Sequence, residues 1–222
     1  MNRISSVVLL LLLASLALIL GLAVISLAQP SSGIGQLVNM QMSNSGVDHP
    51  VTAVLLNFRG YDTLLEMAVL LLAVIAVWSL GSRSSPQQTP SNHSNPILLA
   101  LFRMLTPLMI VVAGYLLWVG AHAPGGAFQA GSILAAAGVL ALLYDQRLAG
   151  RLSSWSLRFS LILGCAMFVA VATGVMLGGA HLLQYPLPWA GSLILLIELA
   201  ATISIGLTLT ALFYGTSTGE RP

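Results

Sequence analysis

Few side chains in this sequence could carry acid–base or ion chemistry, and the acidic ones beside long apolar runs stand out. Asp62 and Glu66 are four positions apart, so they share one face of a helix. Carboxylates inside a membrane are costly and usually line ion or proton routes. Glu66 is followed by a long apolar run. A pairing with Arg59 at the membrane interface is the alternative, and it suits Asp62 better than Glu66.

Glu198 interrupts a second apolar run, LILLIELAATISIGLTL. Thr202, Gly206 and Thr210 follow it at intervals of four, which gives the predicted helix one small, polar stripe. Such a face should point into protein or a water-filled cavity rather than into lipid. Glu198 and Glu66 are therefore the first candidates for a proton or cation route. The alternative for Glu198 is a structural carboxylate tied to a polar group of another subunit.

Arg103 is a basic group inside an apolar run. It lies six residues after Ile97, which is about 9 Å into the predicted helix at the usual rise per residue. Its long side chain can extend to the cytoplasmic membrane interface. Alternatively, it can serve as the counter-charge of an intramembrane carboxylate. Both interpretations stay open.

The turn between two of the apolar runs is the most distinctive stretch. It contains His122, Pro124, Gly125, Gly126, Phe128 and Gln129. Proline ends a helix, and two glycines permit a tight turn that a neighbouring segment can approach closely. A tight turn alone does not explain the histidine and glutamine beside it. Because histidine exchanges protons near neutral pH, His122 joins Arg59, Asp62 and Arg103 as a secondary route candidate. A purely structural histidine is the alternative.

The elements that must position these side chains are membrane-spanning helices. Hydrophobic residues make up 57% of the 222-residue chain and charged residues 6%, against about 25% charged residues in soluble domains. Runs long enough to cross a bilayer occupy residues 4–28, 61–80, 97–121, 129–144, 157–180 and 188–214. They are continuous rather than alternating, so the sequence predicts an all-α integral membrane protein with about six transmembrane helices. A cleaved signal peptide is the alternative for the first run, which is longer than a signal h-region.

The basic residues orient the predicted bundle. All eight are arginine. With six crossings, Arg59 lies alone on one side of the membrane and the other seven lie on the opposite side. The positive-inside rule then places both termini in the cytoplasm.

Composition also divides the chain. Residues 29–48 have the composition of an external loop, and residues 81–95 that of a flexible linker. The linker separates a two-helix module, residues 1–80, from a four-helix domain, residues 96–222. This two-plus-four division suggests two modules fused in one polypeptide.

The sequence gives no sign of an enzyme. Its single cysteine, Cys165, cannot form an internal disulfide or supply a metal cluster. No phosphate-binding loop and no Ser-His-Asp set in a soluble domain are present. We therefore expect no catalytic site, metal or cofactor, and a net charge of +2 gives no reason to expect nucleic acid.

The stretch NFRGYDTLLE resembles a pattern close to DFRGFDTLGE in the C-terminal region of the A subunit of Mrp-type Na+/H+ antiporters. It is similar as well to a small membrane subunit of membrane-bound hydrogenases. Arg59, Asp62 and Glu66 match the pattern, whereas Asn57 replaces an acid and Leu65 replaces a glycine.

The chain from Pro96 onward is similar to the B subunit of the same antiporters. The stretch GAHAPGGAFQAG resembles the family pattern GHxxPGGGFxGG and is one residue shorter before the proline. Glu198 begins a match to an ELA sequence in the last helix of the family. A second acid that usually follows further along that helix is absent here.

This resemblance implies a non-catalytic subunit of a multisubunit cation/proton antiporter in the cell membrane. Such a subunit would help to form a Na+ or H+ route at interfaces with larger antiporter-like subunits. The first alternative is the membrane arm of a redox-driven ion pump related to complex I, such as a group-4 hydrogenase, or of an inorganic-carbon uptake complex. The second is a purely structural linker without ion contact.

Overall fold

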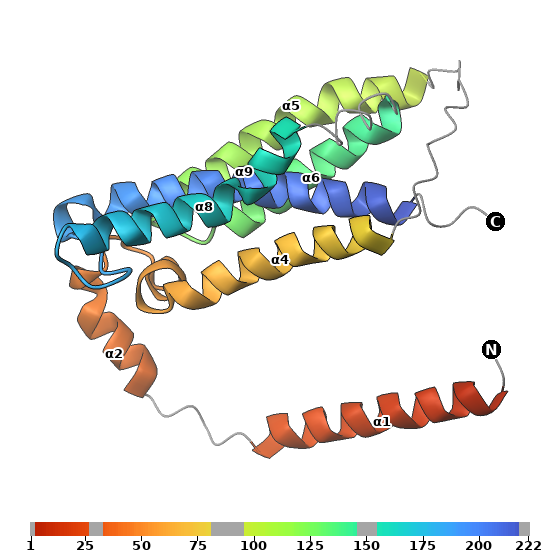
Figure 1. Cartoon of the computed structure of the whole chain (residues 1–222), viewed down its shortest axis with the longest axis horizontal. Helices are drawn as coiled ribbons and strands as arrows, with labels where there is room; N and C mark the ends of the chain where they lie inside the picture. The colour runs from red at the N-terminus through yellow and green to blue at the C-terminus, as the bar shows by residue number, and fades with distance from the viewer. Residues whose placement is uncertain (1–2, 27–32, 81–95, 146–154, 218–222) are drawn as a thin grey trace. The chain divides into compact units, whose positions relative to one another are not determined.

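The computed structural model describes residues 3–26, 33–80, 96–145 and 155–217 (Figure 1). Its elements are α1 (Arg3–Ser26), α2 (Gly33–Gln41), η1 (Met42–Asn44), α3 (Pro50–Thr52), η2 (Ala53–Phe58), α4 (Gly60–Leu80), α5 (Pro96–Val119), α6 (Ala127–Tyr144), α8 (Trp155–Leu177) and α9 (Leu187–Ser217). Every regular element in these residues is helical, and α1, α4, α5, α6, α8 and α9 are long and apolar enough to cross a membrane. The all-α class and the six predicted spans are therefore confirmed.

The chain separates into two units, Met1–Met40 and Gln41–Pro222. The first unit holds α1 and most of α2. Val7–Ser26 of α1 is apolar and long enough to cross a membrane, and the hydroxyls of Ser15 and Ser26 donate to carbonyls of their own helix. Part of the predicted external loop over residues 29–48 is helical, as α2 and η1, because the Gln, Leu and Met residues of this stretch favour a helix. Its external placement stays a prediction.

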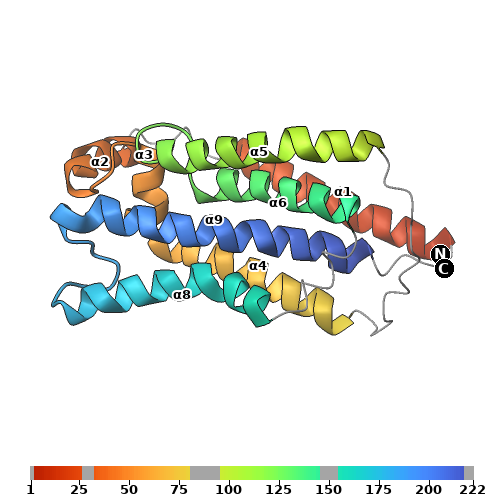
Figure 2. The ribbon, with the colours of Figure 1, turned by 90° about the horizontal axis from the view of Figure 1, so that it is seen from above.

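The second unit is organised around α9, as Figures 1 and 2 show. α9 packs against α6, α8 and α4 and also touches α5. Its buried side chains include Ile194, Ile197, Ala201 and Ile205. A helix that is apolar on all sides needs apolar surroundings on all sides, and other spans of the same chain supply much of this cover for α9.

Small residues let α9 approach its neighbours closely. A Cβ atom on Gly131 of α6 would lie 2.8 Å from the Ile205 side chain, and one on Gly206 would lie 3.0 Å from a side chain of α6. On the α8 side, Ser204 Oγ donates a hydrogen bond to the Leu161 carbonyl at 2.5 Å. Gly206 belongs to the predicted polar stripe, so the stripe faces protein, as expected.

A second set of small residues lies on a face that the described residues leave exposed. Ala166, Ala170 and Gly174 on α8 and Gly178, just after its end, lie at helical spacing, which predicts a helix-packing face. All four are exposed, and no described atom lies within 4 Å of a Cβ atom built on Gly174. α8 instead buries larger side chains such as Phe168. This face is therefore free of contacts among the described residues, and its role in packing stays a prediction.

The chain reaches α4 through a broken helix. α3 continues into η2, a π-helical segment in which the Arg59 N–H donates to the Val54 carbonyl at 2.7 Å. Arg59 leaves helical geometry, with φ −128° and ψ 34°, and α4 begins at the next residue. The Thr63 hydroxyl donates to the Leu55 carbonyl at 2.6 Å and so bridges the break. Such π-helical turns are frequent at functional sites.

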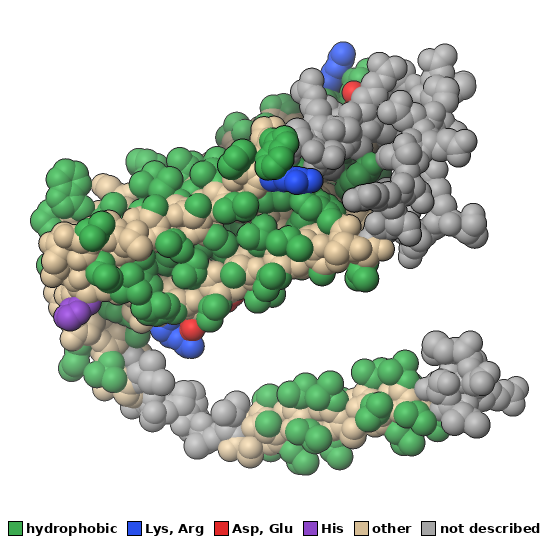
Figure 3. All heavy atoms as spheres, in the orientation of Figure 1, with side chains coloured by type: hydrophobic (Ala, Val, Ile, Leu, Met, Phe, Trp, Pro, Cys, Tyr) green, Lys and Arg blue, Asp and Glu red, His purple; other side chains and the backbone are tan. Residues whose placement is uncertain are grey.

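The cytoplasmic placement of both termini stays a prediction. The division into a two-helix module at residues 1–80 and a four-helix domain at residues 96–222 also stays a prediction. The linker at residues 81–95 lies outside the described residues. α4, from the first predicted module, packs against α9 and α8 of the second. Figure 3 shows the largely apolar face that this unit presents in one view.

Candidate ion and proton site

Glu198 lies in the interior of the second unit. It follows Leu187, the first residue of α9, by eleven positions, or about 17 Å along the helix, and it is 4% exposed. Its carboxylate accepts a hydrogen bond from the backbone N–H of Ala127, the first residue of α6. A Cβ atom on Gly126 would lie 2.9 Å from Glu198 Oε1. The carboxylate therefore sits against the N-terminus of α6.

The N-terminus of α6 suits a negative charge. The first N–H groups of a helix lack partners within the helix and together carry a partial positive charge. Removal from water favours the neutral acid instead, so two opposed influences act on the Glu198 proton. Within the described residues, no ion pair includes Glu198. A group between such opposed influences is a candidate for changing its protonation state during function.

The loop before α6 has no room for side chains at its glycines. Gly126 has φ +115°, which favours glycine. A Cβ atom on Gly120 would lie 2.7 Å from the Gly126 nitrogen, and one on Gly125 would overlap the Leu116 carbonyl. The Gly126 N–H donates to that same carbonyl at 2.9 Å. The glycines thus allow the loop to fold back on the end of α5 and its backbone to lie close to the Glu198 carboxylate.

The other predicted members of the loop have different surroundings. Pro124 is exposed in the turn, and Gln129 is exposed in the first turn of α6. Gln129 Oε1 would lie 3.7 Å from a Cβ atom on Gly126, so this amide is near the Glu198 carboxylate. Phe128 is half-buried and packs against the main apolar core.

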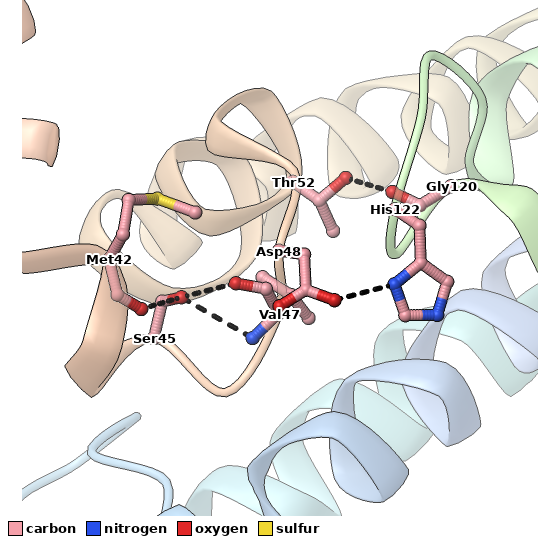
Figure 4. A network of polar contacts seen from close by, with 7 residues as sticks. All are labelled: Met42, Ser45, Val47, Asp48, Thr52, Gly120 and His122. Atoms are coloured by element: carbon pink, nitrogen blue, oxygen red, sulfur yellow. Dashed lines mark hydrogen bonds and ion pairs between the residues drawn. The ribbon is translucent and has the colours of Figure 1, made fainter.

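The stretch from η1 to the end of α3 is hydrogen-bonded to the loop before α6 (Figure 4). Asp48 Oδ2 lies 2.8 Å from His122 Nδ1, and the Asp48 N–H donates to the Ala121 carbonyl at 3.0 Å. The Thr52 hydroxyl donates to the Gly120 carbonyl at 2.5 Å. The His122 and Asp48 side chains are 62% and 81% exposed. His122 therefore joins two surface segments rather than lying in the buried site.

The same segment has a buried anchor at Ser45. Ser45 Oγ lies 2.7 Å from the Met42 carbonyl and 2.8 Å from the Val47 carbonyl (Figure 4). The side-chain amide of Asn57 donates to the Ser45 carbonyl at 2.9 Å. Asn57, which replaces an acid of the family pattern, thus connects η2 to the segment that holds the loop.

A groove on the side of the unit contains the second set of candidates. Its volume is about 680 Å³, and it is lined by Arg59, Asp62, Leu65, Glu66, Val69, Leu70, Phe128, Ser132, Ile205 and Leu209. Arg59 Nη2 and Asp62 Oδ2 are 2.5 Å apart. Glu66 lies six residues after Gly60, or about 9 Å into α4. Glu66 is exposed, and among the described residues it has no ion pair.

The structure does not gather all the predicted residues in one place. Glu198 is not among the residues that line the groove. Arg103 is exposed on α5 and forms no ion pair with any described residue, so its role as a counter-charge stays a hypothesis. In the described part of the chain, no group of three His, Cys, Asp or Glu residues could hold a metal ion.

Three contributors to the site were missed at the sequence level: Asp48, Thr52 and the backbone N–H of Ala127. Asp48 fell at the end of the predicted external loop. The Asp-His-Pro sequence at this point favours a turn. This turn signal could have predicted that the chain folds back here towards another segment. A backbone N–H cannot be recognised from the residue type. The glycine pair before Ala127 indicates only that a neighbouring group approaches the backbone closely at this point.

The family of domains related to the MnhB subunit of Na+/H+ antiporters matches residues 97–215. The chain belongs to this family. The predicted resemblance to the B subunit, which begins at Pro96, is therefore confirmed. The MnhB-related domain includes the glycine loop, the N-terminus of α6 and Glu198, whereas α4 and Glu66 lie before it.

Individual proteins are also similar. An uncharacterized protein of Methanocaldococcus jannaschii is 28% identical over 163 residues, which make up 61% of this chain and 59% of that protein. A chain in the structure of the Mrp complex from Dietzia sp. DQ12-45-1b matches with a TM-score of 0.75 and 21% identity, over 100% of this chain and 27% of that chain. A chain of the membrane-bound sulfane sulfur reductase, an archaeal respiratory membrane complex, matches with a TM-score of 0.72 and 22% identity. The match covers 97% of this chain and 98% of that chain. The two structural matches show a shared fold. This chain spans under two thirds of the Methanocaldococcus protein and about a quarter of the Mrp chain.

Proposed function

We propose that this chain is a membrane subunit of a multisubunit Na+/H+ antiporter-type complex in the cell membrane. In this proposal, Glu198 takes up and releases a proton at the N-terminus of α6 while the complex exchanges ions. The observation that carries it is a carboxylate buried within a membrane helix and held by a backbone donor. The chain itself is not an enzyme, and its partners are other membrane subunits, including larger antiporter-like ones.

The surroundings of Glu198 favour one direction for the route. The Thr202 hydroxyl donates to the Glu198 carbonyl at 2.7 Å, and the Thr210 hydroxyl donates to the Gly206 carbonyl at 2.8 Å. Both hydroxyls are thus engaged with backbone carbonyls, Thr210 also with that of Ala135 in α6 at 3.3 Å, and Gly206 is packed against α6. In this proposal the proton therefore leaves Glu198 towards the glycine loop rather than along the polar stripe.

Residues at the start of α6 are near Glu198 and also line the groove that contains Glu66. Gly126 meets Glu198, and Phe128, two residues later, lines the groove that contains Glu66. We propose that Glu66 serves as a second station nearer the membrane surface, with Arg59 and Asp62 at the groove's outer end. A proton or cation would pass between the stations around the first turn of α6.

A second candidate function is the membrane arm of a redox-driven ion pump. The observation that favours it is the nearly end-to-end correspondence with a chain of the sulfane sulfur reductase. Glu198 would have the same role there, and the energy source would differ. Purification of the intact complex separates the two functions, because iron–sulfur subunits that co-purify would favour the redox arm.

The test of the proton role is Glu198→Gln in the assembled complex. Glutamine keeps the size and the hydrogen-bonding capacity of the side chain but cannot titrate. We expect cation/proton exchange in membrane vesicles to fall roughly 10²-fold, the scale of a lost proton-transfer group. Thr202→Val is the matched control on the same face and should retain exchange. Rates are normalised to assembled complex on a native gel, and near-normal exchange by Glu198→Gln would leave only a structural role.

A further inference from the structure

We propose that the groove between α4, the start of α6 and the middle of α9 is the docking site for a transmembrane helix of another subunit. That helix would place a basic side chain against Glu66. The proposal rests on the chain working within a larger membrane complex, but it does not depend on Glu198 changing its protonation state.

The first reason is the position of Glu66. It is exposed on the outward face of α4, about 9 Å beyond the start of that helix. An exposed carboxylate at this depth faces lipid unless another chain covers it, and intramembrane carboxylates are normally paired or face a protein interior. A glutamate side chain is also too short to extend to the interface as Lys and Arg do.

The second reason is the charge of the groove. Arg59 is 2.5 Å from Asp62, so these two charges neutralise each other at the outer end of α4. Among the described residues no further cation lines the groove. One negative charge is left at Glu66, and the complementary group is a cation from outside the chain.

The third reason is the chemistry of the walls. Leu65, Val69 and Leu70 line the groove from α4, and Ile205 and Leu209 line it from α9. Apolar walls around one charge suit a membrane helix with a single basic residue. Lipid chains could cover the walls but could not neutralise the carboxylate. The span Val7–Ser26 of this chain contains no Lys, Arg or His, so it does not supply the basic side chain.

The experiment places a photo-reactive side chain in the groove of the intact complex. Val69→p-benzoylphenylalanine is irradiated in the membrane, and the cross-linked peptide is identified by mass spectrometry. The matched control is Ile75→p-benzoylphenylalanine, which is also exposed on α4 but does not line the groove. We expect Val69 to give a cross-link to a transmembrane peptide of another subunit that contains Lys, Arg or His. We expect Ile75 not to give that cross-link.

Charge reversal then tests the pairing. Glu66→Lys should lower the Val69 cross-link about tenfold, and replacing the basic residue of the captured helix by Glu should restore it. Cross-links only to lipid, to residues 3–26 of this chain or to a second copy of it would overturn the proposal, as would a captured helix without a basic residue. Glu198→Gln should leave the Val69 cross-link unchanged, so failure of the proton role and failure of the docking site are distinguishable.

Discussion

The two intramembrane glutamates show two ways to place a carboxylate in an apolar helix. Glu198 is enclosed within the chain, where a backbone N–H of α6 donates to it and the glycine loop leaves it room. Glu66 lies on the side of the unit in a groove with apolar walls and no ion pair among the described residues. One site is completed by its own chain, whereas the other needs a partner. The MnhB-related match covers the first and not the second.

The strongest test of this comparison combines the two neutralising substitutions. If Glu66 and Glu198 act in one route, the exchange rate of the Glu66→Gln and Glu198→Gln double variant should be no lower than that of the worse single variant. If they act independently, the free-energy effects should add, and the double variant should be slower by the product of the two factors. The measurement is vesicle exchange per assembled complex. A multiplicative loss would separate the two glutamates into different routes.

The next effect concerns the room that the loop leaves for Glu198. We expect Gly126→Ala to lower the stability of the subunit by about 1–3 kcal/mol, because its φ is +115° and its Cβ atom would crowd the carboxylate. Gly174→Ala is the matched control, since its Cβ atom meets no described atom within 4 Å. That substitution should be neutral or stabilising by about 0.5–1 kcal/mol. Thermal unfolding of the purified complex measures both, and equal stability of the two variants would contradict the packing described for the loop.

Tyr185 provides a buried polar group that lacks the support given to Glu198. It is 5% exposed, its hydroxyl has no described hydrogen-bond partner, and burial raises its pKa from 10.0 to about 12. Because the folded protein holds the hydroxyl proton more tightly than the unfolded chain, this raised pKa stabilises the fold fully below pH 10.0. The stabilisation is lost as the pH rises through 10.0 towards 12. Tyr185→Phe should remove this loss and leave the stability at neutral pH equal or higher by about 1 kcal/mol. Unfolding measured between pH 9 and 12, on the scale set by that pKa shift, tests the expectation, and a clearly destabilised Phe variant would indicate a partner for the hydroxyl.

The smallest effect is expected at the exposed pair of His122 and Asp48. Exposed ion pairs contribute roughly 0–1 kcal/mol, and the backbone bond from Asp48 to Ala121 remains when the side chain is changed. We therefore expect Asp48→Asn to lower stability by less than about 1 kcal/mol and to leave exchange within about twofold of normal. A loss of exchange comparable with that of Glu198→Gln would indicate that His122 takes part in the proton or cation route and is more than a structural contact.

Much of the fold could be predicted because membrane helices are specified by composition. The six apolar runs gave the six spans, and the stripe after Glu198 correctly indicated a face turned towards protein. The spacing of Ala166, Ala170, Gly174 and Gly178 was less informative. Small residues show that a helix can be approached closely, but not which chain approaches it, and here that face is exposed.

The details of the site were harder to predict for a physical reason. Glu198 is held by a backbone group, and main-chain donors are the same at every residue, so only the neighbouring glycines gave a signal. The start of the second span was also incomplete, because the apolar pattern predicted a helix only from Tyr61. The structure adds helix from Pro50, with a break at Arg59 before α4.

The π-helical segment η2 sets the rotational phase of α4. One residue corresponds to about 100° of rotation around an α-helix, so the number of residues between Pro50 and Gly60 decides which side of α4 faces outward. With the present number, Met67 is buried and its neighbour Glu66 is exposed in the groove. Insertion or deletion of one residue in this stretch would turn the Glu66 carboxylate away from the groove, unless local unwinding of the helix compensated for it. Chain length in η2 is thus as strict a requirement for the groove as the identity of the residues that line it.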